Sequence, residues 1–163
     1  MSEPGKLRFI STDRRVREDR RFVVGKGNFA ADIVPQGVKH VALVTCPYPA
    51  ARIVSIDSKA ALAAPGVHYV LTGDEFCRNT DSLAIGVDTP KVTRYALADK
   101  VVRYAGEWVA AVVADTRALA EDAAELVEVE YDATPHVIDP EEAAKDGSPL
   151  VHPAHGSNVI LQK

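Results

Sequence analysis

The stretch that decides the fold runs from Trp108 to Tyr131 and reads WVAAVVADTRALAEDAAELVEVEY. Its first seven residues, 108–114, form an unbroken apolar run of the length expected for a strand that is buried on both faces. From Arg117 onward the apolar residues recur at helical spacing, and acidic residues gather on the opposite side. Residues 127–131 then alternate apolar and acidic side chains, which is typical of a half-exposed strand. The stretch therefore predicts a strand, a helix and a second strand.

The elements around this unit complete an α+β fold. The main helix is predicted over about residues 116–127, with Asp115 or Thr116 as its N-cap. Further strands and short helices are predicted on both sides of it: strands at Val101–Tyr104, His40–Cys46, Arg52–Asp57 and Val67–Leu71, and helices at Ser58–Ala64 and Asp139–Lys145. We expect these strands to form one mixed sheet, covered by the main helix and the short ones.

Two segments are less regular. Residues 21–33 begin as a short strand and then turn at Gly25–Gly27. This glycine pair lacks the third glycine and the following helix that a phosphate-binding loop needs, so it predicts a plain turn. Residues 74–96 are predicted to be an irregular surface excursion, and long irregular loops in compact domains are often functional.

The chain divides into three predicted parts. Residues 1–21 are charged and aperiodic and predict an extended N-terminal arm, whose arginines suit docking on an acidic protein surface. Residues 22–145 form the folded domain. Residues 146–163 contain several loop residues before a last apolar run, which predicts a linker leading toward a following domain.

Composition excludes several functional classes. A length of 163 residues suits about one domain, and 47% hydrophobic with 26% charged residues is ordinary for a globular protein. The net charge of −4 gives no basic footprint for nucleic acid and argues against anionic membrane surfaces. The sequence shows no apolar stretch near 18 residues and no signal peptide. Two cysteines, Cys46 and Cys77, suit a reducing compartment, so a cytoplasmic location is expected.

No residue pattern predicts a catalytic, cofactor-binding or metal site. His152 and His155 have a spacing that can bind metal on a helix, but Pro153 lies between them and no further ligands lie nearby in the sequence. Cys46 precedes Pro47 at a strand end, where a buried structural cysteine is favoured over a nucleophile.

The turn before the central strand is the predicted contact surface. Glu107 and Trp108 follow Gly106 and are expected to be exposed at the start of the central strand. Because a tryptophan at such a position more often packs in a core or a subunit interface than in an active site, we expect Gly106, Glu107 and Trp108 to face a partner, together with the 74–96 excursion.

Several stretches resemble one known family in the same order along the chain. They are GKGNFAADI (25–33), CPYPAARIVSID (46–57), APGVHYVLTGD (64–74), DKVVRYAGEWVAAVVADT (99–116), AEDAAELVEVEY (120–131) and DPEEA (139–143), preceded by the arm VREDRRF (16–22). They are similar to the start of molybdenum hydroxylase large subunits, the relatives of xanthine dehydrogenase, aldehyde oxidase and carbon monoxide dehydrogenase. Two positions differ: the family often has a histidine within the segment matched by 49–51, and often proline at Trp108.

The resemblance implies an α/β hammerhead domain and a cytoplasmic, multi-subunit oxidoreductase. Such enzymes hydroxylate aldehydes, N-heterocycles or similar small molecules with oxygen from water, using molybdopterin, 2Fe-2S clusters and usually FAD. It also implies that the residues around molybdenum lie in later domains. We therefore expect this chain to bind none of these cofactors by itself, and its partners to be the remaining molybdenum-binding domains or subunit, an iron–sulfur subunit and an FAD subunit.

Two functions from different classes remain open. The first is a structural, non-catalytic segment or split subunit of a molybdenum hydroxylase. The second is a stand-alone α/β binding or interaction module without redox activity. A third, a hydrolase that uses Cys46 and a histidine, has no further support in the sequence.

Overall fold

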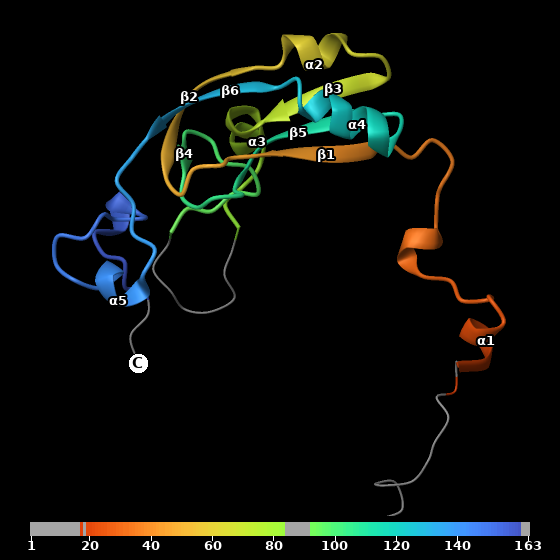
Figure 1. The fold of residues 1–163 in the computed structure, drawn as a ribbon, viewed down its shortest axis with the longest axis horizontal. Helices are drawn as coiled ribbons and strands as arrows, with labels where there is room; N and C mark the ends of the chain where they lie inside the picture. Colours follow the sequence, from red (N-terminus) through yellow and green to blue (C-terminus); the bar gives the residue numbers. More distant parts are fainter. Residues whose placement is uncertain (1–16, 18, 84–91, 161–163) are drawn as a thin grey trace, which may run out of the picture. The chain divides into compact units, whose positions relative to one another are not determined.

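The computed structural model describes residues 17, 19–83 and 92–160. The chain forms two compact units, residues 1–38 and residues 39–163. The predicted boundaries near residues 21 and 145 stay predictions. The secondary structure of both units is drawn in Figure 1.

The smaller unit contains α1 (Asp19–Val23) and the short 3-10 helix η1 (Ala30–Asp32). The strand predicted at the start of residues 21–33 is therefore wrong, because the helical bond from Val24 N to Arg20 O, 3.3 Å, and the closing bond from Lys26 N to Arg21 O, 2.9 Å, fold this segment on itself. The rings of Phe22 and Phe29 stack with centroids 5.3 Å apart. The predicted glycine turn is confirmed: Gly25 has a φ of +71°, in the left-handed region that glycine adopts without strain.

The larger unit contains six strands and four α-helices among its described residues. They are β1 (His40–Thr45), β2 (Ala51–Asp57), α2 (Lys59–Ala63), β3 (Val67–Thr72), α3 (Gly73–Asn79), β4 (Val101–Val102), β5 (Trp108–Ala114), α4 (Arg117–Ala124), β6 (Glu128–Ala133) and α5 (Pro140–Ala143), with a 3-10 helix, η2 (Pro153–His155), near the end. This content confirms the α+β class with one main helix and short ones.

The strands form two antiparallel sheets of three strands each, in the orders β1-β5-β3 and β4-β2-β6. The single mixed sheet expected from the sequence is therefore corrected. A strand–helix–strand unit suggests neighbouring parallel strands, but β1 and β3 already occupy both edges of β5. β6 consequently pairs with β2 in the second sheet, and α4 connects the two sheets.

The central unit follows its sequence pattern closely. β5 spans the predicted residues, and Val109–Val112 are all buried. The Thr116 side chain caps α4 by accepting a hydrogen bond from Leu119 N at 3.2 Å. The helix ends at Ala124, earlier than predicted, because the bonds from Leu126 N to Ala123 O and from Val127 N to Ala124 O tighten its last turn.

The excursion predicted over residues 74–96 begins with a helix instead. α3 follows Thr72 directly and carries Asp74 and Glu75 in its first turn, where acidic residues favour a helix start. Hydrogen bonds between Ser82 and Arg94 close the base of the segment. Residues 84–91 of the predicted excursion lie outside the described residues.

The core lies around β5. One cluster of buried side chains joins α2, α4, β3 and β5: Ala61, Val70, Ala110, Val112, Ala123 and Val127. A second cluster joins the two sheets near the β4–β5 turn: Cys46, Ala98, Val102 and Val109. Val44 and Val129 pack against both clusters, so β1 and β6 tie them into a continuous core.

One glycine is required by close packing. A Cβ built on Gly73 would lie 1.7 Å from Ala98 O, closer than any side chain can approach. The backbone at the start of α3 therefore rests directly on the segment that leads into β4.

Candidate functional site

The predicted contact residues lie on the turn that connects β4 to β5. Gly106 has a φ of +88° and donates its N–H to Cys46 O at 2.7 Å. Cys46 N in turn donates to Glu107 O at 2.9 Å. The turn is thereby fastened to the end of β1, and its backbone is fixed on the surface beside the second core cluster.

Glu107 faces the interior, so its predicted exposure is wrong. The residue is 8% exposed, and its Oε2 accepts a hydrogen bond from Arg103 N at 2.5 Å. Its Oε1 lies 3.8 Å from Arg103 Nη1. This bond holds Arg103 N away from a strand partner, which explains why β4 ends at Val102 and not at the predicted Tyr104.

Trp108 remains at the surface, as the sequence suggested. It is 45% exposed, although it opens the most buried strand of the molecule. Its carbonyl accepts a hydrogen bond from Ala98 N at 2.7 Å, so its backbone is held in place while part of the indole stays exposed to solvent. Gly106 and Trp108 are thus exposed and available to a partner, whereas the buried Glu107 side chain stabilises the turn by accepting the Arg103 N–H.

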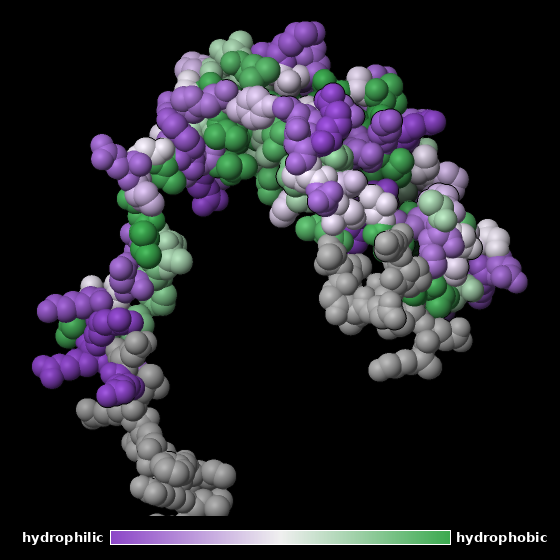
Figure 2. Space-filling view, turned by 180° about the vertical axis from the view of Figure 1, so that it is seen from behind, coloured by the Kyte–Doolittle hydropathy of each residue, from purple (hydrophilic) through white to green (hydrophobic). Residues whose placement is uncertain are grey.

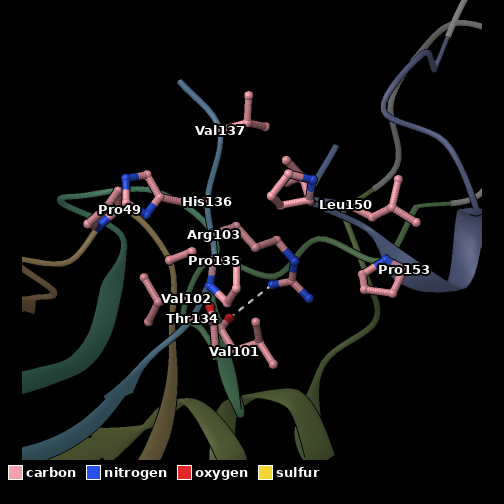
Figure 3. A pocket seen from close by; sticks show the side chains of 13 residues that line it. Pro49, Val101, Val102, Arg103, Thr134, Pro135, His136, Val137, Leu150 and Pro153 are labelled. Carbon is pink, nitrogen blue, oxygen red and sulfur yellow. Dashed lines mark hydrogen bonds between the residues drawn. The ribbon is translucent and has the colours of Figure 1, made fainter. Parts of the chain in front are cut away.

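A pocket of about 360 Å³ lies next to this turn. Figure 3 shows side chains from four segments around it. The pocket is lined by the β1–β2 connection, β4 with Arg103, the segment after β6 and the proline-containing end of the described chain: residues 49–50, 101–103, 134–137, 149–151 and 153. Most of the lining is apolar, which is typical of sites that accept apolar groups.

Arg103 is the principal charged group in the pocket wall. Its Nη1 donates to Val101 O at 3.1 Å, the bond drawn in Figure 3. Within the described part of the chain, its Nε is buried without a hydrogen-bond partner. The side chain also lines a neighbouring hollow that contains Arg94 and His152. Burial first, and then the charges of Arg103 and Arg94, lower the pKa of His152, so this imidazole is neutral near pH 7.

The histidines His40, His68 and His155 do not line the two pockets beside the turn. His155 Nε2 lies 3.4 Å from Val159 O, close to the short helix η2. Residues 17, 19–83 and 92–160 contain no group of three His, Cys, Asp or Glu side chains that could hold a metal ion. His40 begins β1, and His68 Nε2 lies 2.8 Å from Asp115 Oδ1 at the opposite end of the sheet.

Both cysteines are packed into the structure. Cys46 is 1% exposed, and its Sγ accepts a hydrogen bond from Tyr48 N at 3.4 Å, which confirms the predicted buried structural role. Cys77 Sγ donates to Leu97 O at 3.7 Å, and burial, followed by Asp99 and Asp74, raises the pKa of this thiol. Burial and the neighbouring Cys46 also raise the pKa of Tyr131. The Cys77 thiol and the Tyr131 phenol are therefore protonated near neutral pH and are poor nucleophiles.

Sequence reasoning missed the pocket. Residues 146–163 were predicted to be a linker and residues 134–139 a connector or edge strand, whereas the structure brings residues 134–137 and 149–151 against β4. Pro135, Pro149 and Pro153 were the available signal, because proline leaves a sheet ladder and exposes apolar rings. No local pattern states which other segment these prolines will meet.

Comparisons with known proteins identify the fold. Residues 24–135 match the family described as aldehyde oxidase and xanthine dehydrogenase, a/b hammerhead domain. The chain is 42% identical over 137 residues to the carbon monoxide dehydrogenase large chain of Hydrogenophaga pseudoflava, covering 83% of this chain and 17% of that protein. It is 37% identical over 148 residues to the nicotine 6-hydroxylase large subunit of Paenarthrobacter nicotinovorans, covering 89% and 18%.

Solved structures agree with these matches. Quinoline 2-oxidoreductase from Pseudomonas putida 86 superposes with a TM-score of 0.78 at 40% identity, over 85% of this chain and 18% of that one. The aldehyde oxidoreductase from Desulfovibrio gigas superposes with a TM-score of 0.73 at 33% identity, over 84% and 16%. The chain thus spans less than a fifth of the relatives it matches.

Among the described residues, every helix is too short or too polar to span a lipid bilayer.

The order of the motifs, the two antiparallel sheets and the matches all agree, and the resemblance to molybdenum hydroxylase large subunits is confirmed. The chain belongs to the a/b hammerhead domain family of aldehyde oxidases and xanthine dehydrogenases.

Proposed function

We propose that this chain is a structural, non-catalytic segment or split subunit of a molybdopterin-dependent hydroxylase. The match of residues 24–135 to a hammerhead domain carries the proposal. Relatives named as a large chain, a large subunit and a complex subunit belong to multi-subunit proteins. The partners we infer are the molybdenum-binding domains, an iron–sulfur subunit and an FAD subunit, in a cytoplasmic enzyme that oxidises aldehydes, N-heterocycles or similar small molecules.

The chain's own side chains do not fit an iron–sulfur cluster. A 2Fe-2S cluster is held by four ligands, usually cysteine thiolates. This chain has two cysteines, and Cys46 and Cys77 are held by different hydrogen-bond partners in different elements. We therefore assign the clusters, molybdopterin and FAD to other parts of the complex and route no reaction step through this chain.

The surface around the β4–β5 turn supports a packing role. Trp108 is a large side chain with a fixed backbone and an open face, and exposed aromatic residues are enriched at protein interfaces. The neighbouring apolar pocket offers room for a partner's side chain. We infer that the turn and the pocket together contact the rest of the complex.

The test is capture of the tagged chain from its native cells, followed by mass spectrometry and metal analysis. Co-purification with larger subunits, molybdenum and iron is expected. Trp108→Ala should reduce the captured subunits at least tenfold while the thermal midpoint of the chain changes little, and Leu62→Ala, a similarly exposed side chain on α2, should leave capture unchanged. Aldehyde or N-heterocycle turnover by the purified chain alone would contradict the structural role.

The alternative is a stand-alone binding module. Under it, the mostly apolar pocket beside β4 would hold a small molecule and not a partner's side chain. Under that alternative the captured chain would be free of molybdenum and larger subunits, and Trp108→Ala would have no assembly to weaken. The same capture experiment therefore separates the two functions.

A further inference from the structure

The pocket and the neighbouring hollow beside the β4–β5 turn meet at Arg103. The pocket has a volume of about 360 Å³ and the hollow one of about 200 Å³, and both are lined by Arg103 and Val151. The pocket is mostly apolar, whereas the hollow contains Arg94, Glu107 and His152, so the two adjoining spaces offer an apolar half and a charged half. Surface hydropathy alone marks no such site on the face drawn in Figure 2, where hydrophobic residues of the described chain are interspersed with hydrophilic ones.

The hollow carries a net positive charge. Its lining contains the guanidinium groups of Arg94 and Arg103 and the carboxylate of Glu107, while His152 is neutral near pH 7 because burial and then both arginines lower its pKa. Within the described part of the chain, Arg94 forms hydrogen bonds through its backbone alone. Two positive groups against one negative group leave one positive charge, which a single carboxylate neutralises and a doubly charged phosphate exceeds.

Arg103 has an edge that no described residue uses. Its Nη1 donates to Val101 O at 3.1 Å and lies 3.8 Å from Glu107 Oε1, which is too long for a hydrogen bond. Its buried Nε has no hydrogen-bond partner among the described residues. Nε and Nη2 form the edge on which a carboxylate accepts two parallel hydrogen bonds. Because buried donors in native proteins are nearly always paired, an acceptor supplied by a ligand would complete this site.

The wall shared by the pocket and the hollow is held in a fixed position. Asn158 Oδ1 accepts the Val151 N–H at 2.9 Å, and Asn158 Nδ2 donates to Pro149 O at 2.9 Å and to Ala143 O at 3.0 Å. One side chain therefore fastens residues 149–151 to the last residue of α5. A wall that is ordered before a ligand arrives reduces the entropy that binding costs.

We propose that the pocket and the hollow form one binding site for an apolar carboxylate. The carboxylate lies at the unused edge of Arg103 and near the charge of Arg94, and its apolar group enters the pocket between Pro135, Leu150 and Pro153. Figure 3 shows these three side chains around Arg103. The proposal names a ligand class that the proposed function leaves open, and it does not depend on that function.

Titration of the purified 163-residue chain with hexanoate, followed by NMR, tests the site. Saturable shifts at Val151 and His152, with a Kd of about 1 mM, are expected for a ligand of this size. Hexanamide has the same shape without the charge, and acetate has the charge without the apolar chain, so each should bind about tenfold more weakly or worse. No saturable shift up to about 20 mM hexanoate, or equal binding of hexanamide, would overturn the proposal.

Arginine variants test where the carboxylate lies. Arg94→Gln removes an exposed charge and should weaken hexanoate binding about tenfold while the thermal midpoint stays the same. Arg103→Gln should weaken it at least as much, and its fold is checked by thermal unfolding because the bond to Val101 O is also lost. Arg78→Gln is the matched control: this exposed arginine of α3 is held by Asp74 at 3.0 Å, and its loss should leave the Kd unchanged. Wild-type affinity in Arg94→Gln would contradict the placement of the carboxylate.

A free organic acid and an acidic residue of a partner chain carry the same group, and capture from native cells separates these sources. Fewer captured subunits with Arg94→Gln than with wild type or Arg78→Gln would assign the carboxylate to a partner chain. Equal capture by all three would assign it to a free acid. A wild-type chain that captures no subunit would contradict the proposed function and also assign a free acid, while the hexanoate titration still decides whether the site exists.

Discussion

The two sheets of the larger unit have the same size and the same antiparallel pattern, but different residues stabilise them. The β1-β5-β3 sheet is centred on β5, whose side chains are almost all buried and apolar. The β4-β2-β6 sheet is half exposed, and its outer face carries pairs such as Arg52 with Asp132 and Ser55 with Glu130. Burial of apolar area dominates stability, whereas exposed pairs contribute little. Substitutions should therefore cost much more in the first sheet and at its junctions than in the second.

The largest effect is expected at the close approach that joins the two sheets. Gly73→Ala places a methyl group against Ala98 O, and backbone atoms on both sides must move. Overpacking of this kind usually costs 1–3 kcal/mol, and because the obstacle is backbone we expect about 3 kcal/mol in the free energy of unfolding. Denaturant unfolding measures it. Gly147→Ala is the comparison: a Cβ there meets no atom within 4 Å, and the variant should cost only the backbone strain of its φ of +83°, about 1 kcal/mol. An equal loss at both glycines would show that close packing is not the cause.

The next effect compares one valine in each sheet. Val112→Ala in β5 removes a fully buried side chain and should cost about 2.5 kcal/mol, from lost burial and the cavity that remains. Val129→Ala in β6 removes a partly buried one and should cost about 1 kcal/mol. Urea unfolding of both variants measures the two losses in the free energy of unfolding. Equal losses would mean that the two sheets are stabilised alike.

The contrast between the sheets also separates what sequence could predict from what it could not. β5, the Thr116 cap and β6 were predicted because each depends on neighbours within a few residues. The assignment of β5 and β6 to different sheets was missed, because it depends on β1 and β3 occupying both edges of β5. Local periodicity contains no information about which distant strands compete for an edge.

The contact residues of the β4–β5 turn were predicted only in part, because some of them depend on contacts that the local sequence does not show. Trp108 was placed at the surface correctly from its position at the start of the strand. Glu107 was placed wrongly, since its burial depends on the bond from Arg103 N across the turn. A buried carboxylate needs a hydrogen-bond donor. For Glu107 this donor is the backbone N–H of Arg103, four residues earlier, and the sequence does not show that the turn brings the two groups together. The pocket was missed because it forms where the residues after β6 and part of the predicted linker meet at β4.

A third, smaller effect should be present near neutral pH and disappear in acid, at the end of the first sheet. Asp115 accepts hydrogen bonds from Lys39 and His68, which lower its pKa from 3.8 to about 2. Because the pKa is lower in the folded state, the carboxylate stabilises the fold above pH 4, and this contribution is lost as the pH falls through 2. Asp115→Asn should therefore be less stable than wild type at pH 6, and the difference should shrink between pH 4 and 2. A constant difference across that range, measured by thermal unfolding, would contradict this linkage.

The smallest effect is expected in the second sheet, at the cross-strand pair of Arg52 and Asp132. The two groups lie 2.5 Å apart, but both side chains are more than half exposed, so water and salt screen their attraction. Arg52→Ala, Asp132→Ala and the double variant should give a coupling energy of about 0.5 kcal/mol that falls further at high salt. Since β2 also packs Ile53 and Ile56 inward, the sheet should survive all three changes. A coupling above about 2 kcal/mol would show that the exposed face carries stability comparable with the buried valines, and the contrast between the two sheets would be lost.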